Sequence, residues 1–187
     1  RQYTLQIKNL ETGVILDDKI ENTTGGGVWA NDNKTLFYTR KDPVTLRSDK
    51  IYKHKLGTPT SEDVLIFHED DDTFSTFIYR TKSKKYLVIG SFSTLTSEFQ
   101  ILPTDNPDGG FMVFSPRKRG LEYTIFHYED SFYILTNKDK AENFKLMRTS
   151  EEKTTSEHWQ EFISHREKVL LEDIDIFMEY YVLSERE

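Results

Sequence analysis

The sequence predicts an all-β protein, a β-propeller fragment of about four blade equivalents of four-stranded antiparallel sheets. Two observations predict this class. Four short β-rich segments, named a, b, c and d in chain order, recur about every 48 residues. β-branched and aromatic residues dominate these segments, and clusters of Gly, Pro, Asn and Asp separate them. Because the chain has 187 residues, it has room for about four such repeats.

The b segments show the repeat most directly. They begin at Leu36, Leu87, Tyr133 and Tyr181, so consecutive starts lie 51, 46 and 48 residues apart. The a, c and d segments recur with a similar spacing. A repeat of this length with four strands is typical of propeller blades, each of which packs face to face with its neighbours.

The chain is expected to begin with an incomplete blade in residues 1–20, with strand c at Tyr3–Ile7 and strand d at Val14–Asp17. The Gly25–Gly27 run is interpreted as a flexible turn into the next strand, because it neither opens a helix nor ends in the Gly-Lys-Ser/Thr of a phosphate loop. Glu151–Trp159 is interpreted as a long c–d loop. The prediction totals sixteen strands, and the three whole blades and the final strands a and b occupy residues 26–70, 74–117, 121–166 and 172–187.

The two incomplete blades raise the question of how the sheet edges are protected. In one arrangement, the N-terminal strands c and d pair with the C-terminal strands a and b, which completes a fourth blade and closes a small ring. The alternative is an open arc or a swapped assembly.

Composition narrows the classes of function. There are 25 Lys and Arg against 32 Asp and Glu, which gives a net charge of −7 and makes a nucleic-acid-binding protein a poor interpretation. The chain has no Cys, which excludes a disulfide scaffold, a thiolate zinc site and a cysteine nucleophile. No apolar run approaches the ~18 residues of a membrane-spanning helix. We therefore expect no nucleic-acid or membrane partner, and we assign no cofactor.

Several short stretches suggest a family. The most specific are Trp29–Asp32 and Pro43–Leu46, and Arg1–Tyr3, Glu69–Thr73 and Phe114–Arg117 add to them. With these residues the chain resembles the propeller domain of oligopeptidase B, also called protease II, in the prolyl oligopeptidase family of serine peptidases. The resemblance extends over essentially the whole chain.

The resemblance implies a two-domain peptidase, in which a propeller caps an α/β-hydrolase domain and admits only short peptides to a Ser-Asp-His triad that cleaves after Arg or Lys. This chain would be the middle of the propeller and inactive alone. The implied partners are the peptidase domain of the same parent chain and short basic oligopeptides. A cytoplasmic location is expected, and a periplasmic one stays open because the chain starts at Arg1 rather than Met.

No residue of this chain is assigned a catalytic or metal-binding role. The nucleophile of an α/β-hydrolase needs G-x-S-x-G at a strand-to-helix turn, and the closest sequence, Gly90-Ser91, lies inside a predicted strand. A general base needs a positioned partner, and none of the histidines has one in the sequence. We interpret as ordinary sheet or loop residues His54, His68, His127, His158 and His165.

The sharpest charged feature is the run Glu69, Asp70, Asp71 and Asp72, in a turn between strands d and a. An EF-hand calcium loop would need glycine at its sixth position and glutamate at its twelfth, and neither is present here. Two interpretations stay open. The run is either a solvated turn or a patch that steers cationic peptides by its negative charge.

Basic residues mark the same predicted face. Arg117, Lys118 and Arg119 lie in the next d–a turn, and Arg1 falls in a b–c turn. Three basic residues without interleaved aromatic residues are a weak nucleic-acid signal. Arg1 and Arg117 are therefore candidates for interdomain contact, and surface solvation is the alternative.

Two further classes of function stay open at this level. A stand-alone propeller scaffold that binds protein partners on one face would share the repeat. A propeller glycosidase would need a pair of carboxylates that act as acid and base, and no such pair is evident.

Overall fold

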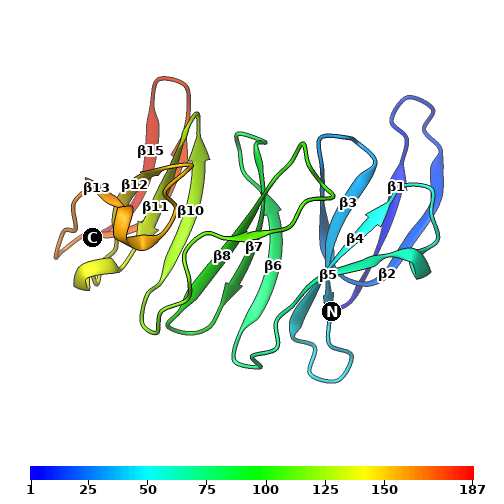
Figure 1. The fold of residues 1–187 in the computed structure, drawn as a ribbon, viewed down its shortest axis with the longest axis horizontal. Helices are drawn as coiled ribbons and strands as arrows, with labels where there is room; N and C mark the ends of the chain where they lie inside the picture. Colours follow the sequence, from blue (N-terminus) through cyan, green and yellow to red (C-terminus); the bar gives the residue numbers. More distant parts are fainter.

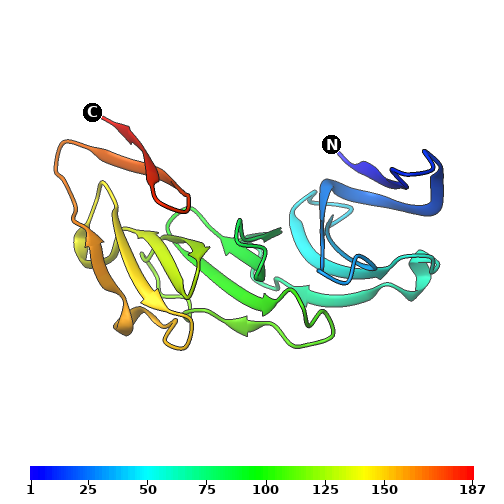
Figure 2. The ribbon, with the colours of Figure 1, turned by 90° about the horizontal axis from the view of Figure 1, so that it is seen from above.

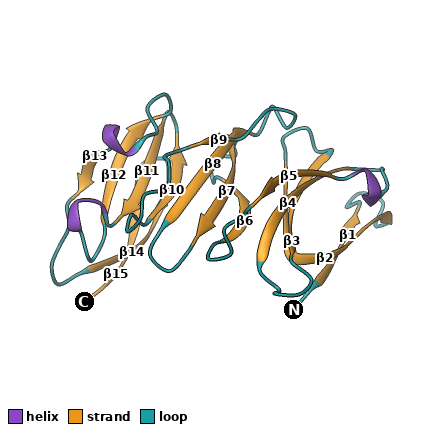
Figure 3. Cartoon of the chain, turned by 60° about the horizontal axis from the view of Figure 1, so that its bottom comes forward, coloured by secondary structure: helices purple, strands orange, loops and turns teal.

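A computed structural model describes residues 1–187 as fifteen strands and three short 3-10 helices (Figures 1 and 3). None of its helices is long and apolar enough to cross a membrane. The strands are β1 (Tyr3–Lys8), β2 (Ile15–Trp29), β3 (Thr35–Lys41), β4 (Ser48–Lys55), β5 (Val64–His68), β6 (Ser75–Arg80), β7 (Tyr86–Phe92), β8 (Ser97–Pro103), β9 (Met112–Val113), β10 (Tyr123–Tyr128), β11 (Ser131–Thr136), β12 (Lys145–Ser150), β13 (Gln160–Ile163), β14 (Leu170–Ile176) and β15 (Tyr181–Arg186). The 3-10 helices are η1 (Thr60–Glu62), η2 (Lys138–Lys140) and η3 (Ser156–His158).

The strands form four antiparallel sheets in chain order, β1–β5, β6–β9, β10–β13 and β14–β15. Each strand pairs with the next one in the chain, so every sheet is a meander. The central strands are buried on both faces because sheets lie on either side of them; six consecutive residues of β7 are buried. The outermost strand β9 is exposed at both of its residues. This is the arrangement that the 48-residue repeat predicts.

The prediction of sixteen strands is wrong by one, because the expected strands d and a at the N-terminus are a single strand, β2. Its first part pairs with β1 and its last part with β3, and Thr23 pairs with both neighbours. Gly25 has φ = +97°, and the register with β3 shifts between Thr23 and Gly27. The glycines therefore bend a continuous strand instead of forming a turn, since only Gly adopts such φ values without a steric penalty.

The ring-closure hypothesis is also wrong. β1 pairs with β2 alone, and β14 and β15 form a two-stranded sheet of their own. Figure 2 shows the two chain ends at opposite ends of an arc, with the sheets arranged around its open side. Large side chains fill the space between adjacent sheets, so successive sheets splay around the arc and β1 does not reach β15. The open-arc alternative describes this chain.

The largest core lies between the second and third sheets. It contains twelve buried residues, among them Phe114, Tyr123, Phe132 and Trp159. Ring centroids of Phe114 and Phe132 lie 4.8 Å apart at an interplanar angle of 73°, which is a favourable edge-to-face contact. The core between the first and second sheets contains only four buried residues.

Candidate functional site

One edge of the sheets collects the charged turns that the sequence singles out. The β5–β6 and β9–β10 turns lie there with the β3–β4, β7–β8 and β11–β12 turns, at the lower edge of Figure 1. Hydrogen bonds join neighbouring turns, such as the one from the Asn137 amide to the carbonyl of Gly120. We call this surface the turn face, and it comprises residues 42–47, 69–74, 93–96, 114–122 and 137–144.

Glu69 and Arg117 meet at the centre of the turn face. Nη2 of Arg117 lies 2.8 Å from Oε2 of Glu69 and 3.2 Å from Oε1 of Glu98. The Glu69 side chain is only 5% exposed. These two residues are 48 positions apart, one blade repeat, so they occupy equivalent turns of adjacent sheets. The ion pair therefore joins the first sheet to the second.

The environment of Arg117 favours its charged form. Burial of the guanidinium by itself lowers the pKa of Arg117, but the hydrogen bonds and charges of Glu69 and Glu98 outweigh it, and the net pKa is raised. The guanidinium carbon also lies 3.9 Å from the centroid of the Phe74 ring, a cation–π contact. Arg117 is thus mainly a structural clamp, with 30% of its side chain left exposed.

Arg47 holds the backbone of the acidic turn. Its guanidinium donates hydrogen bonds to the carbonyl oxygens of Glu69, Asp71 and Phe74, at 3.1, 3.1 and 2.7 Å. Three carbonyls bound by one side chain restrict the backbone conformation of the turn. The three aspartates that follow Glu69 are consequently presented in fixed positions.

Asp70, Asp71 and Asp72 are exposed. Asp70 lies 3.0 Å from Nδ1 of His68 and is 89% exposed. Hydrogen bonds from the hydroxyl and the backbone N–H of Thr73 lower the pKa of Asp71, and the nearby Arg117 and Arg47 charges add to this. Of the four acidic residues in this turn, Glu69 is buried in an ion pair with Arg117, and the other three are exposed to solvent.

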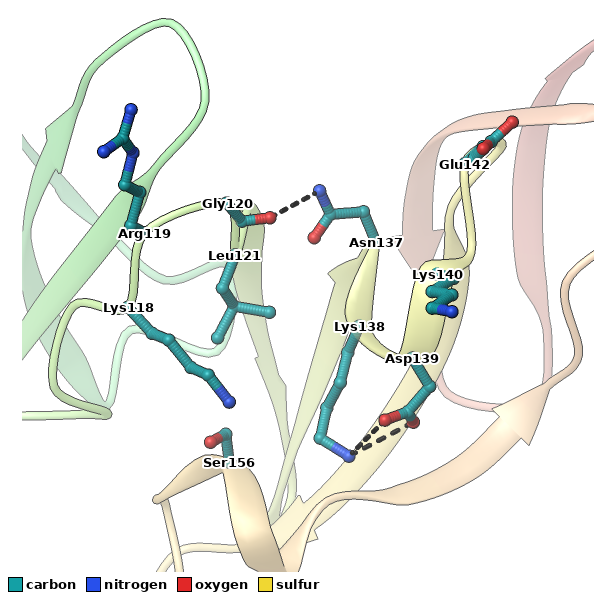
Figure 4. Close-up of a pocket in the computed structure, with 10 residues that line it drawn as sticks. All are labelled: Lys118, Arg119, Gly120, Leu121, Asn137, Lys138, Asp139, Lys140, Glu142 and Ser156. Carbon is teal, nitrogen blue, oxygen red and sulfur yellow. Dashed lines mark hydrogen bonds and ion pairs between the residues drawn. The ribbon is translucent and has the colours of Figure 1, made fainter.

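The remaining basic residues line a shallow cleft of about 330 Å³ between the β9–β10 turn and the β11–β12 turn (Figure 4). Lys118 and Lys138 extend toward the end of the cleft at Ser156, whereas Arg119 points away from it. The Lys138 ammonium is 3.2 Å from Asp139, which also binds Lys145 at 3.1 Å. Lys118 and Arg119 are exposed.

Arg1 lies beside the turn face. It is exposed and precedes β1, and its neighbour Gln2 borders the same pocket as Lys41 and Pro43 of the first sheet. The predicted residues thus lie on one side of the sheets, and three of them are in contact, because Arg117 pairs with Glu69 at 2.8 Å and lies 4.0 Å from Asp71, whose N–H donates to the Glu69 carboxylate.

Two buried histidines lie in networks that the sequence does not reveal. His54 is fully buried, with its ring nitrogens 2.7 Å from Asp63 and 3.0 Å from Asp18. His127 lies 2.6 Å from Glu151 and 2.8 Å from the Ser83 hydroxyl. Burial lowers the pKa of His127 although Glu151 acts in the opposite direction.

These partners are far from the histidines in sequence, and no local spacing marks them. His54 contacts two carboxylates and no nucleophile. His127 does contact the Ser83 hydroxyl, but this serine lies in the turn between β6 and β7, where it also accepts a hydrogen bond from the Lys85 N–H, and not at the strand-to-helix turn of a G-x-S-x-G motif. We interpret both histidines as structural groups. The chain also contains no cluster of three side chains that could hold a metal ion.

All of residues 1–187 match the family described as prolyl oligopeptidase, N-terminal beta-propeller domain. The chain belongs to the prolyl oligopeptidase family. Its fold class and the resemblance inferred from its sequence are thereby confirmed.

Relatives of this family support the assignment. The chain is 40% identical over 186 residues to dipeptidyl aminopeptidase BI of Pseudoxanthomonas mexicana, covering 100% of this chain and 26% of the relative. It is 38% identical over 149 residues to Protease 2 of Moraxella lacunata, covering 79% of this chain and 21% of the relative. The chain thus spans about a quarter of the length of the peptidases it matches.

Solved structures agree with the family assignment. Oligopeptidase B from Leishmania major superposes with a TM-score of 0.91 at 31% identity, covering 99% of this chain and 26% of that structure. Oligopeptidase B from Trypanosoma brucei, in a closed form with covalently bound antipain, has a TM-score of 0.84 at 36% identity, covering 91% and 24%. The open arc of sheets is therefore a section of a propeller of the prolyl oligopeptidase family.

Proposed function

We propose that this chain is the substrate-gating propeller segment of an oligopeptidase B-like serine peptidase that cleaves short peptides after Arg or Lys. The observation that carries the proposal is the match of the whole chain to the N-terminal propeller of the prolyl oligopeptidases. The chain itself holds no G-x-S-x-G motif. In this proposal, catalysis belongs to a peptidase domain and this segment controls access.

The turn face supplies the charge for substrate attraction. Asp70, Asp71 and Asp72 are exposed and held by the Arg47 contacts, and the chain carries a net charge of −7. Fixed carboxylates at an entrance raise the local concentration of cationic peptides and their association rate. Glu69 contributes indirectly, because its pairing with Arg117 positions the turn.

The same face is our candidate for contact with the peptidase domain. Lys118 and Arg119 are exposed there, Arg1 is exposed beside the face, and Arg117 keeps part of its side chain accessible. A cationic rim beside an acidic turn suits a partner surface with alternating charge. We place the whole enzyme in the cytoplasm as part of this proposal.

Activity assays on two proteins test the proposal. The purified 187-residue chain and a longer protein that joins it to a peptidase domain are incubated with fluorogenic peptides that carry Arg, Lys or Gln before the reporter. We expect cleavage after Arg and Lys only, by the longer protein only, and its loss with a serine-directed inhibitor. Inhibitor-sensitive turnover by the 187-residue chain, or equal cleavage after Gln, would contradict it.

A further inference from the structure

A pocket opens where the first sheet divides. β2 pairs with β3 as far as Thr23 and Arg40, and its earlier residues pair with β1 alone. β3 stays beside β4, with Arg40 opposite Lys50. The two parts of the sheet diverge around a pocket of about 630 Å³ whose lining is almost entirely polar.

Arg40 lies in this pocket against two aromatic rings. Its guanidinium carbon is 4.9 Å from the ring centroid of Tyr52 and 5.5 Å from that of Tyr38. The two rings stack on each other with centroids 5.7 Å apart and an interplanar angle of 17°. Nε of Arg40 is buried and has no hydrogen-bond partner. The guanidinium is therefore held in place while one of its donors is unused.

Two other arginines of the chain lie over aromatic rings, and both have partners. Arg117 over Phe74 binds two carboxylates. Arg148, 5.5 Å from the Tyr133 ring centroid, donates to the Ser131 hydroxyl at 2.9 Å. A buried N–H without a partner costs free energy, and folded proteins rarely leave one unused. Arg40 differs from both because its guanidinium has no acceptor in the protein, which leaves its terminal N–H groups available to a ligand.

The charges around the pocket leave an excess of positive charge. Lys19 pairs with Glu21 at 2.7 Å, and Lys50 pairs with the buried Asp49. Lys41, which also lines the pocket, has no carboxylate partner in the structure. In a chain of net charge −7, this is a local site for an anion.

We propose that the pocket binds a ligand carboxylate, with Arg40 as its anchor. The outer edge of a guanidinium presents two parallel Nη–H groups that match the two oxygens of a carboxylate, whereas the Nε–H of Arg40 is buried. Because Tyr38 and Tyr52 already hold the guanidinium, binding costs little side-chain entropy. Lys41 adds a second positive charge, and Thr60, which also lines the pocket, carries a hydroxyl that can act as a neutral donor.

Two sources of carboxylate fit this chemistry, namely the C-terminus of a peptide and an acidic side chain. The inference does not rest on the proposed peptidase activity, because it concerns binding to this chain alone. Its failure would leave the cleavage assay described above untouched.

Calorimetric titration of the 187-residue chain at low salt tests the inference with three probes. N-acetyl-diglycine carries a terminal carboxylate, N-acetylglutamic acid α-amide carries only a side-chain carboxylate, and N-acetyl-diglycine amide carries none. We expect at least one carboxylate probe to bind about tenfold more tightly than the neutral amide, and the stronger of the two identifies the source. Saturation should also shift the Nε–Hε resonance of Arg40 in a ¹⁵N NMR spectrum.

Variants separate a specific site from general charge attraction. Arg40→Lys keeps the charge but removes the planar donor edge, so it should weaken carboxylate binding about tenfold. Arg148→Lys, the matched control, should leave binding unchanged. Equal affinity for the amide, equal affinity of Arg40→Lys, or an unmoved Arg40 resonance overturns the proposal. The resonance measurement uses the unmodified chain and decides the matter even where Arg40→Lys fails to fold.

Discussion

The first three sheets form two junctions, and different interactions stabilise each of them. The second and third sheets meet through a dry core of twelve buried residues, whereas the first and second share only four. Both junctions have ion pairs at the rim, such as Lys53 with Asp108 at the smaller one and Lys85 with Glu151 at the larger one, but at the smaller junction the ion pairs, which include Arg117 with Glu69, accompany a much smaller core. Apolar contact is non-directional, but ion pairs require particular positions. We call the contact between the first and second sheets the polar junction, whose stability depends on the positions of its turns. We call the contact between the second and third sheets the dry junction, whose stability depends on how completely apolar side chains fill its core.

The largest expected effect breaks the dry junction. Phe114→Ala removes a fully buried ring that contacts Phe132 and Trp159, and should lower the free energy of unfolding by about 3–5 kcal/mol. Urea titration followed by circular dichroism measures it. Met112→Ala, at a 60% exposed position two residues away, is the control and should change stability by less than about 0.5 kcal/mol. A loss for Phe114→Ala no larger than that of the control would contradict the dry-junction interpretation.

The next effect breaks the polar junction. Arg117→Met leaves the buried Glu69 carboxylate without its cation, and should cost about 2–3 kcal/mol, reduced from a fully buried case by the partial exposure of Arg117. The double variant Arg117→Met, Glu69→Gln should recover part of this loss, which a double-mutant cycle measures. Lys118→Met is the control for charge alone. Strict additivity of the two substitutions would show that the pair is not coupled.

The pH dependence sharpens the comparison at the rim of the dry junction. Burial lowers the folded-state pKa of His127, so the unfolded chain binds more protons below its ordinary value of 6.5. Its contribution to stability is complete above pH 6.5 and is lost as pH falls through 6.5 toward the folded pKa. In Glu151, burial raises the pKa but the Lys85 and His127 hydrogen bonds outweigh it, so the net pKa is lowered and its contribution is lost only below 4.5.

His127→Gln should therefore flatten the dependence of unfolding free energy on pH just below 6.5, by at most about 1.4 kcal/mol per pH unit. Chemical denaturation at several pH values measures it. His158→Gln, an exposed histidine, is the matched control and should leave the slope as it is. An unchanged slope in His127→Gln would mean that other groups cause the dependence.

The smallest effect on stability is expected on the turn face. Asp70→Asn with Asp72→Asn changes only exposed side chains, and should alter stability by less than about 0.5 kcal/mol. In the proposed peptidase, it should lower kcat/KM for Arg peptides about twofold or more at low salt and less at high salt. Glu129→Gln, exposed in the β10–β11 turn at the other ends of the strands, is the control. Equal losses in both variants would indicate a general charge effect rather than steering from this turn.

The repeat made most of the fold predictable because each strand of a meander pairs with its neighbour in the chain. Segments such as Leu36–Arg40 and Tyr133–Asn137 have strand-forming composition, and turn residues separate them. The prediction failed at Gly25–Gly27, where local composition suits a turn as well as a bent strand. The segment forms a bent strand because β2 pairs with Tyr3–Lys8 on one side and with Thr35–Lys41 on the other.

The candidate site was predictable only as a set of charged turns on one face. That Glu69 pairs with Arg117 follows from their separation of one repeat, a signal present in the sequence but recognisable only once the sheets are seen to be adjacent. His54 with Asp18, and Arg40 with its two tyrosines, have no such signal. Their side chains meet because separate strands converge in space.

By itself, the sequence determined the all-β class, the order of the strands, the family and the absence of a hydrolase nucleophile motif, because these depend on local composition and on contacts between neighbouring segments. Only the tertiary structure shows that the chain is an open arc, that the Glu69 carboxylate is paired with Arg117, and that Nε of Arg40 has no hydrogen-bond partner. These three features depend on the angle between the sheets and on the burial of side chains. The angle and the burial set the distances between charged groups and the dielectric environment around them, and the spacing of residues along the chain encodes neither.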